Sequence, residues 1–418
     1  MKQKSGNYRW RILGLLFFAT TLNYIDRQVL GILKPFIASD LGWTEISYGN
    51  IVSAFQIAYA LGLLLAGTFL DKYGTKPVYG IAVTIWSIAC AFHSAARSVL
   101  GFAIARIFLG LGESANFPAA VKSVSEWFPK KERATANGIF NSGSNVGAFV
   151  TPLIISFVTL KFGWRMAFVI TGTLGFIWII LWLISYQDPH KHKKLNAAEL
   201  EYILSDNRGE ETSALSWLPL LKHKQSLAIC ILKFSTDWVW WLMLFWTPDF
   251  LNKMFNVNLN EIVLPLIIIY TVASIGGIFG GWLSSSLIKK GKSIDFSRKT
   301  AMLVCAICMV TIVLVPTASR LWVSVLLLSL STAFHQGWSS NLFALASDIF
   351  PKNVVGRVVS LAGFTAAIAG ALTSVFIGIV LQLTNSYTIL FAVAGSMYLS
   401  AWFILKMMIP KIEPVKGV

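Results

Sequence analysis

Residues 125–130 read SEWFPK, and residues 347–352 read SDIFPK. Each copy follows a long apolar segment and precedes another, so the two occupy corresponding places in the two halves of the chain. A weaker echo pairs GTFLDKYGTK at 67–76 with GGWLSSSLIKKGK at 280–292. Repeats in the same direction along the chain predict two copies of one helical unit, related by an axis along the membrane normal.

Twelve apolar segments surround these repeats, each of a length that can cross a bilayer. They lie at residues 10–36, 47–70, 77–96, 98–121, 134–159, 165–186, 226–251, 261–288, 299–318, 321–346, 354–383 and 387–409. One long polar stretch divides the first six from the last six. We therefore predict an all-α membrane protein with a six-helix half at 1–186, a cytoplasmic linker at 187–225 and a second six-helix half at 226–418.

The linker carries one local folding signal. Asn196 precedes Glu199 by three residues, which is the spacing of an N-cap with a capping box. A short helix through Leu204 is expected to follow. The linker is interpreted as a tether between the halves, because it is too short to form a signalling domain.

The composition agrees with a multi-pass membrane protein. Of 418 residues, 56% are hydrophobic and only 13% are charged, whereas soluble domains carry about twice that charged fraction. The net charge of +16 is not interpreted as nucleic-acid binding, because Lys and Arg cluster between apolar segments. Their distribution places both termini in the cytoplasm. Cys305 and Cys308 have a C-x-x-C spacing without a second ligand pair, so no metal or redox site is expected.

Ionisable residues interrupt two of the apolar segments. Asp26 and Arg27 are adjacent in the first, and Arg106 and Glu113 lie in the fourth. Ionised groups in hydrocarbon cost on the order of several kcal/mol unless they face a partner, water or a ligand. The seven-residue spacing of Arg106 and Glu113 exceeds the three or four of a local ion pair. This pattern predicts a carrier that moves an organic anion together with a proton, although a purely structural buried network is the alternative.

The loop GTFLDKYGTK resembles the G-x-x-x-D-[RK]-x-G-x-[RK] loop of the major facilitator superfamily. In that family the acidic and basic groups hold the cytoplasmic side closed in one state. The matching residues here are Gly67, Asp71, Lys72, Gly74 and Lys76. Gly67 is expected to allow close helix packing. The alternative is an ordinary basic cytoplasmic loop.

Further motifs narrow this resemblance to the anion:cation symporter branch. They are LNYIDRQVL (22–30), RIFLGLGESANFPAA (106–120), SEWFPKKERA (125–134) and FNSGSNVGA (140–148). KFSTDWVWW (233–241) and AFHQGWSSNLF (333–343) resemble the hexuronate transporters of that branch. The resemblance implies a twelve-helix fold in two pseudo-symmetric halves, a pair between Asp26 and Arg106, and proton coupling at Glu113. It also implies substrate contacts at Tyr24, Arg27 and Tyr59.

The residues of the first half support an anion site. A guanidinium binds a carboxylate bidentately, which makes Arg27 the candidate for the substrate carboxylate. Tyr24 lies three residues earlier, and Gln56 and Tyr59 are likewise three apart. In the fifth apolar segment, the polar residues Ser144 and Asn145 are candidates for contact with sugar hydroxyls. Interhelical hydrogen bonding and interfacial anchoring are the alternatives.

The second half offers a dense polar patch in its tenth segment, where His335, Trp338 and Ser339 share one helix face and Asn341 lies beside them. Lys233 lies four residues before Asp237, so a local ion pair and a ligand role are equally open. No second Arg lies at depth in this half, which favours monocarboxylates.

We therefore expect proton-coupled uptake of a sugar acid, most of all a hexuronate such as glucuronate or galacturonate. The alternatives are another organic anion, such as galactonate or glucarate, and less favourably a transport-dead sensor. The expected setting is a monomer in the bilayer of a bacterial inner membrane, with no cofactor, no metal, no nucleic acid and no enzymatic activity.

Overall fold

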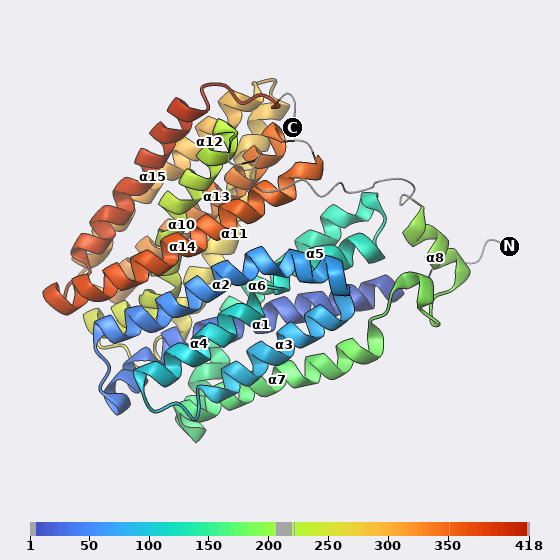
Figure 1. Ribbon diagram of the computed structural model, residues 1–418. Helices are drawn as coiled ribbons and strands as arrows, with labels where there is room; N and C mark the ends of the chain where they lie inside the picture. Colours follow the sequence, from blue (N-terminus) through green and yellow to red (C-terminus); the bar gives the residue numbers. More distant parts are fainter. Residues whose placement is uncertain (1–5, 206–219, 221, 351, 416–418) are drawn as a thin grey trace. The chain divides into compact units, whose positions relative to one another are not determined.

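The computed structural model describes residues 6–205, 220, 222–350 and 352–415, and every regular element in them is a helix (Figure 1). Their contacts group the chain into two compact units. Unit 1 comprises Met1–Leu30 and Ile57–Ser213, and unit 2 comprises Gly31–Gln56 and Ala214–Val418. The predicted linker lies partly outside the described residues, at 206–219 and 221. The predicted division into halves at 186 and 226 stays a prediction.

Unit 1 contains one end of each of the first two helices and the helices that follow them. These are α1 (Tyr8–Leu41), α2 (Glu45–Tyr73), α3 (Thr75–Phe92), α4 (Val99–Glu113), α5 (Asn116–Trp127), α6 (Lys130–Phe162), α7 (Trp164–Ser185), η1 (Pro189–Lys191) and α8 (Ala197–Leu204). Helix α3 packs against both α4 and α7. Gly74 and Gly163, with φ of 84° and 81°, follow α2 and α6 in a backbone region that favours glycine.

Unit 2 contains the remaining ends of α1 and α2 and the helices after the linker. These are α10 (Lys224–Phe255), α11 (Val263–Lys289), α12 (Ile294–Met309), η2 (Val310–Thr317), α13 (Leu321–Ile349), α14 (Lys352–Thr384) and α15 (Thr388–Met408). Helix α11 packs most extensively on α13, and α10 on α14. A Cβ on Gly276 would lie 2.3 Å from Ala333 Cα, and one on Gly280 would lie 2.3 Å from Gly337 Cα. These glycines therefore permit the close approach of α11 and α13.

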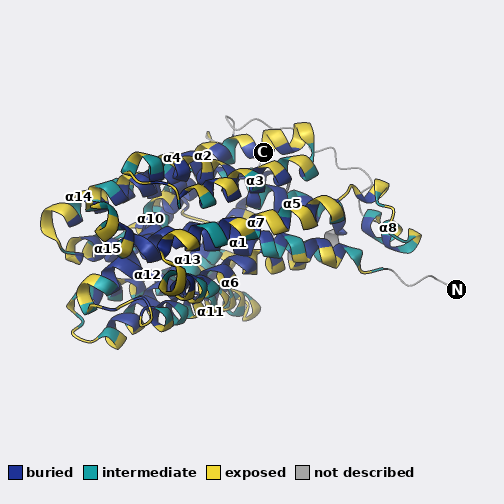
Figure 2. Cartoon of the chain, turned by 90° about the horizontal axis from the view of Figure 1, so that it is seen from below, coloured by how far each residue is buried: buried dark blue, intermediate teal, exposed yellow. Residues whose placement is uncertain are grey.

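The helices have the lengths and surfaces of membrane spans. In the described part of the chain, 10 segments are long and apolar enough to cross a bilayer, and α4 and α5 together form one of them, Val99–Trp127. The long helices α1 and α13 fall outside this set and carry the charged residues of 26–34 and the polar patch of 335–341. Large apolar side chains are exposed, among them Ile278 and Met407, each at 76%. Figure 2 shows buried and exposed positions alternating along the same helices, as expected for helices that face both protein and lipid.

The predicted short helix of the linker is confirmed. The Asn196 side chain accepts a hydrogen bond from the Glu199 backbone N–H at 2.7 Å. Helix α8 begins directly after Asn196, at Ala197, and ends at Leu204. The buried Glu199 carboxylate accepts hydrogen bonds from the Arg9 backbone N–H at 3.2 Å and from its guanidinium at 3.3 Å. The linker helix is thus fixed to the start of α1 within unit 1.

Candidate functional site

Arg27 and Glu113 form a buried ion pair between α1 and α4. The Arg27 Nε and Nη2 atoms donate to Glu113 Oε2 at 3.0 and 2.9 Å. Both side chains are almost fully buried, and Glu113 Oε1 has no hydrogen-bond partner among the described residues. A guanidinium held in this way by one carboxylate oxygen is a strong, charge-assisted contact that a second carboxylate can compete for.

Two aromatic rings enclose the same guanidinium. The Arg27 Cζ atom lies 5.1 Å from the centre of the Tyr24 ring and 4.8 Å from that of Tyr59. Asn23 Oδ1 accepts a hydrogen bond from Arg27 Nη2 at 3.3 Å. Tyr24, Arg27 and Tyr59, which the sequence placed in one site, are therefore brought together. Within unit 1, the Arg27 guanidinium lies between two aromatic rings that also carry phenolic hydroxyl groups. This combination suits a carboxylate attached to a sugar ring.

Asp26 points to a different set of partners. Cys90 on α3 donates its thiol hydrogen to Asp26 Oδ1 at 3.2 Å, and the thiol also lies 3.2 Å from the Thr171 hydroxyl on α7. Asp26 Oδ2 has no hydrogen-bond partner among the described residues. This contact could not be predicted from the sequence, because a cysteine in an apolar segment is most simply interpreted as a small apolar helix residue. A buried carboxyl with one free oxygen is suited to carry a proton.

Arg106 lies behind Arg27. Its two terminal nitrogens each donate to the Arg27 backbone carbonyl at 3.4 Å. The guanidinium of Arg106 thereby supports the turn of α1 that carries Asp26 and Arg27. The pair between Asp26 and Arg106 that the family resemblance implies stays a prediction.

Residues 67–76 form the end of α2, the turn at Gly74 and the start of α3. Asp71 is exposed and pairs with Lys122, whose Nζ lies 2.7 Å from Asp71 Oδ1, while Gly74 provides the turn. The close packing expected at Gly67 is not found in this structure, because an added Cβ would meet no described atom within 4 Å. Lys72 is likewise exposed, and the Lys76 carbonyl accepts a hydrogen bond from Trp182 Nε1 at 3.0 Å.

The nearby SEWFPK segment contributes Glu126 to a second polar contact. Thr75 donates to Glu126 Oε1 at 2.7 Å, and the Tyr186 hydroxyl donates to the other carboxylate oxygen. Burial, and then the neighbouring Glu126 carboxylate, raise the pKa of the Tyr186 phenol well above its usual range. This repeat motif therefore has a structural role at the ends of α3 and α7.

Helix α6 contacts α1 through glycine. A Cβ on Gly143 would lie 2.5 Å from the Phe17 carbonyl oxygen, and one on Gly147 would lie 2.6 Å from that of Thr21. Ser144 donates to the Asn141 carbonyl of its own helix at 2.7 Å, and Asn145 is exposed. Of these two candidates, Asn145 thus has the more accessible side chain.

The tenth-segment patch of unit 2 is anchored by aromatic residues. The His335 ring stacks on Trp240, with centroids 5.1 Å apart, and its Nδ1 atom is hydrogen-bonded to the Tyr398 hydroxyl. Trp338 contacts the edge of the same tyrosine at 5.5 Å. The sequence did not identify Trp240 or Tyr398, because both lie on other helices, α10 and α15. Trp240 and Tyr398 thus fix the orientation of the His335 imidazole, and Trp338 packs against Tyr398.

Asn341 joins two helices. Its amide nitrogen donates to the carbonyl oxygens of Gly280 and Gly337, both at 2.9 Å. This is the interhelical role that polar side chains often take in membranes. Ser339 is buried on the same helix. Lys233 forms an ion pair with Asp237, one of the two roles that its spacing left open, with Nζ 2.6 Å from Oδ2.

Gln56 is the remaining candidate of unit 2. Its side chain is fully buried, and neither amide atom has a hydrogen-bond partner among the described residues. A buried polar group without a partner costs about 1–3 kcal/mol, which a ligand or water can recover. Gln28 of unit 1 has the same property and was not singled out from the sequence. The described residues hold no group of three or more metal-ligating side chains.

Comparisons with known proteins identify the family of the chain. The sequence matches the family profile of the Major Facilitator Superfamily over residues 16–374. It is 31% identical over 396 residues to the hexuronate transporter of Escherichia coli strain K12, covering 94% of this chain and 91% of that protein. It is 29% identical over 401 residues to a protein called a probable galactarate/D-glucarate transporter in Bacillus subtilis strain 168, covering 92% and 88%.

Among solved structures, the fold is similar to that of a bacterial homologue of the human lysosomal transporter Spinster in an inward-facing, occupied conformation. The TM-score is 0.75 at 17% sequence identity, covering 97% of this chain and 96% of that chain. At this identity the similarity concerns the fold alone. The profile match and the curated relatives show that the chain belongs to the Major Facilitator Superfamily of membrane transporters, with its all-α, twelve-helix fold in two pseudo-symmetric halves.

Proposed function

We propose that this protein is a proton-coupled symporter of a sugar acid, and that its preferred substrate is a hexuronate such as glucuronate or galacturonate. The observation that carries the proposal is the buried Arg27–Glu113 pair, with the Tyr24 and Tyr59 rings on either side of the guanidinium. The relative named a hexuronate transporter supports this substrate class. The setting is a bacterial inner membrane, with both termini in the cytoplasm and the monomer as the working unit.

The coupling follows from competition for one guanidinium. While Glu113 is ionised, it occupies the Nε and Nη2 donors of Arg27. A proton on Glu113 removes the negative charge and frees these donors for the substrate carboxylate. Proton and substrate then favour the same state, which is the thermodynamic condition for symport.

Asp26 serves as a second proton carrier. It lies next to Arg27 in the chain but is hydrogen-bonded to Cys90 rather than to the guanidinium. The ionised Asp26 carboxylate therefore does not compete with the substrate carboxylate for Arg27. Its role is in the conformational cycle, where loss of charge at this buried position allows α1 to move relative to α3 and α7.

The site favours one carboxylate over two. Arg27 receives the single carboxylate of a hexuronate, and the phenols of Tyr24 and Tyr59 beside it are left for the hydroxyl groups. A dicarboxylate such as galactarate is the second candidate, and the Bacillus subtilis relative supports it.

The experiment is a competition assay in proteoliposomes. Uptake of labelled glucuronate is measured with an excess of unlabelled galacturonate, galactonate, galactarate, glucarate or neutral glucose. We expect the hexuronates to compete best and glucose not to compete. Equal competition by glucose would contradict carboxylate recognition, and stronger competition by galactarate or glucarate would assign the protein to dicarboxylates.

A further inference from the structure

A buried ion pair within one helix of unit 2 is not explained by the stability of that helix. Lys233 Nζ lies 2.6 Å from Asp237 Oδ2, and the two side chains are only 9% and 13% exposed. Both lie in α10, which is long and apolar enough to span a membrane. A charged pair at this spacing stabilises a helix by about 0.2–0.5 kcal/mol, whereas burial of each ion costs on the order of several kcal/mol. The pair therefore costs more than its local spacing returns.

The pair does not join α10 to another helix. Among the described residues, Lys233 Nζ donates a hydrogen bond to Asp237 alone. Its neighbour on α13 is the ring of Phe343, whose centre lies 4.7 Å away. Asn341, in contrast, joins α13 to α11 through the Gly280 carbonyl. Since an ammonium group carries three hydrogens, Lys233 has further donors for water or a ligand.

The space beside Lys233 is too small for an organic ligand while the pair is intact. A cavity of about 10 Å³ borders the lysine, and apolar side chains of α10, α13 and α14 form its other walls. A water molecule needs roughly this volume. An anion can therefore reach the ammonium only in place of the Asp237 carboxylate.

Polar side chains of α13 lie along the same part of α10. His335 stacks on Trp240, and Phe343 lies against Lys233. These two contacts show that α13 runs antiparallel to α10, because the numbers fall on one helix as they rise on the other. Ser339, halfway between His335 and Phe343, is buried and lies at the level of the carboxylate of the pair. The pair is thus accompanied by a hydroxyl and an imidazole.

The other titratable groups around Asp237 come from two neighbouring helices. Helices α13, α14 and α15 pack against α10. His335 of α13 and Tyr398 of α15 interact electrostatically with Asp237, and they are hydrogen-bonded to each other. Helix α14 has no titratable residue between Arg357 and its end at Thr384. Lys233 is therefore the group whose positive charge keeps Asp237 ionised.

We propose that Lys233 and Asp237 form a second, proton-controlled anion site, which binds the carboxylate of a small organic anion. While Asp237 is ionised, its own carboxylate occupies Lys233. When Asp237 takes a proton from the surrounding water, its charge is lost and the ammonium group is released to bind the carboxylate of the ligand. Ser339 offers its hydroxyl to the same ligand. The choice of a sugar acid as ligand rests on the proposed function, whereas the proton control does not.

The test follows the charge of Asp237 in purified, full-length protein in detergent. Dicyclohexylcarbodiimide is an apolar reagent that adds to protonated carboxyl groups, and peptide mass spectrometry locates the N-acylurea that forms. In the parent protein, labelling of Asp237 should rise as the pH falls, because the ionised carboxylate does not react. Lys233→Met removes the paired charge, and a buried carboxyl group without it stays protonated. Labelling in alkaline buffer should then be roughly tenfold faster than in the parent, a change of about 1.4 kcal/mol.

A matched control makes this result specific. Lys299→Met breaks another lysine–aspartate pair at the same spacing in unit 2, with Asp295, and should leave the labelling of Asp237 unchanged at every pH. Parent-like labelling of Asp237 in Lys233→Met would overturn the proton control, and so would equal acceleration in Lys299→Met. Folding is checked by size-exclusion chromatography. If Lys233→Met fails to fold, the parent decides, since labelling that does not rise as the pH falls would overturn the proposal.

Binding of the anion is measured at the same carboxyl group. Arg27→Met removes the cation of the other buried pair, so that glucuronate can act only elsewhere. In acidic buffer, glucuronate should slow the labelling of Asp237 in Arg27→Met, and neutral glucose should not. The slowing should be lost when Lys233→Met is added to Arg27→Met. Slowing that persists in the double variant would overturn the anion site.

A panel of anions separates this site from the proposed function. Galactonate and galactarate are tested in Arg27→Met beside glucuronate. If either of them slows the labelling of Asp237 and glucuronate does not, the proposed preference for hexuronates fails while the anion site at Lys233 is supported. If none of the three slows the labelling, the anion site is overturned, and uptake of hexuronates is still decided by the competition assay.

Discussion

Replacing Glu113 by Gln is the most informative perturbation of the charged cluster. The substitution keeps the shape of the side chain but removes the charge that competes with substrate for Arg27. Two hydrogen bonds of 3.0 and 2.9 Å join this pair, and bonds to charged groups contribute about 1.5–3 kcal/mol each. Displacing the ionised carboxylate therefore costs on the order of 3 kcal/mol, which corresponds to roughly 150-fold in affinity.

The predicted consequence is a change in how binding depends on pH. In the parent protein, affinity for glucuronate should fall as pH rises, by at most about tenfold per pH unit because one proton is linked to binding. In Glu113→Gln, affinity should stay at the high, acidic-side level and vary little with pH. Proton-driven accumulation should be lost, although exchange of substrate continues.

The assay is equilibrium binding by calorimetry in mildly acidic and mildly alkaline buffer, together with counterflow in proteoliposomes. Glu201→Gln is the matched control, since it removes an exposed carboxylate of the linker helix. A Glu113→Gln variant that keeps the parent's pH dependence of binding would refute the competition for Arg27. Loss of the pH dependence of binding in the Glu201→Gln control would refute it as well.

Three further predictions concern the neighbouring side chains. Arg27→Lys keeps the charge but loses the planar fork, so affinity for the acid should fall by about tenfold or more in the same binding assay; unchanged affinity would place the carboxylate elsewhere. Cys90→Ala removes the donor to Asp26 and should shift the pH dependence of uptake, whereas Cys90→Ser should retain it; identical profiles for both variants would make the contact incidental. Asn341→Ala should lower the free energy of unfolding by about 1–3 kcal/mol, because two hydrogen bonds to carbonyl groups are lost. The ranking of sugar acids in the competition assay should not change. An altered ranking, with the free energy of unfolding of the parent protein, would support the predicted role of Asn341 in binding hydroxyl groups.

The sequence predicted what depends on local composition. Lengths and hydropathy predict the long helices, and the spacing of Asn196 and Glu199 predicts the start of α8, because both signals lie within a few residues. The depth of Arg27 and Glu113 in apolar segments likewise predicted that each needs a partner, and the structure pairs them with each other.

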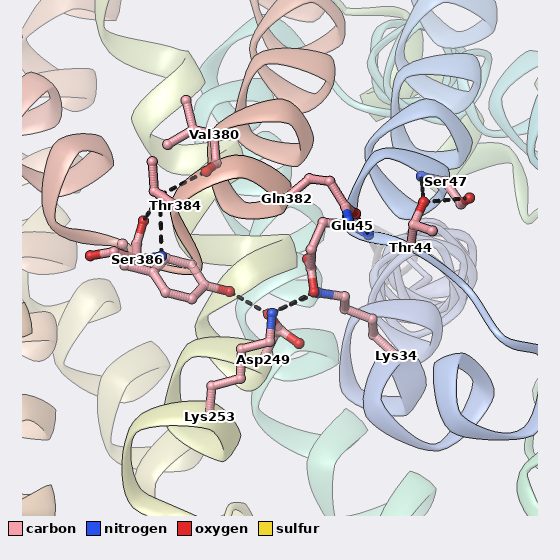
Figure 3. A network of polar contacts seen from close by, with 11 residues as sticks. Lys34, Thr44, Glu45, Ser47, Asp249, Lys253, Val380, Gln382, Thr384 and Ser386 are labelled. Carbon is pink, nitrogen blue, oxygen red and sulfur yellow. Dashed lines mark hydrogen bonds and ion pairs between the residues drawn. The ribbon is translucent and has the colours of Figure 1, made fainter.

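Contacts between distant segments were beyond this reasoning. Nothing near Lys34 in the sequence indicates its ion pair with Asp249 (Figure 3). Cys90 lies between Ala89 and Ala91 in an apolar segment, and its bond to Asp26 exists only because α3 packs beside α1. Asn341 was expected to contact a substrate. Its spacing from the other polar residues places it on a helix, but the spacing does not tell whether the side chain meets a ligand or α11.

The central claim is that a hexuronate and a proton cross the membrane together. Proteoliposomes that contain a pH-sensitive dye, with no ion gradient imposed, are given glucuronate from outside while the internal pH is recorded. The account predicts internal acidification in step with uptake of labelled glucuronate, and little of either with Glu113→Gln. Uptake of labelled glucuronate without internal acidification would contradict it.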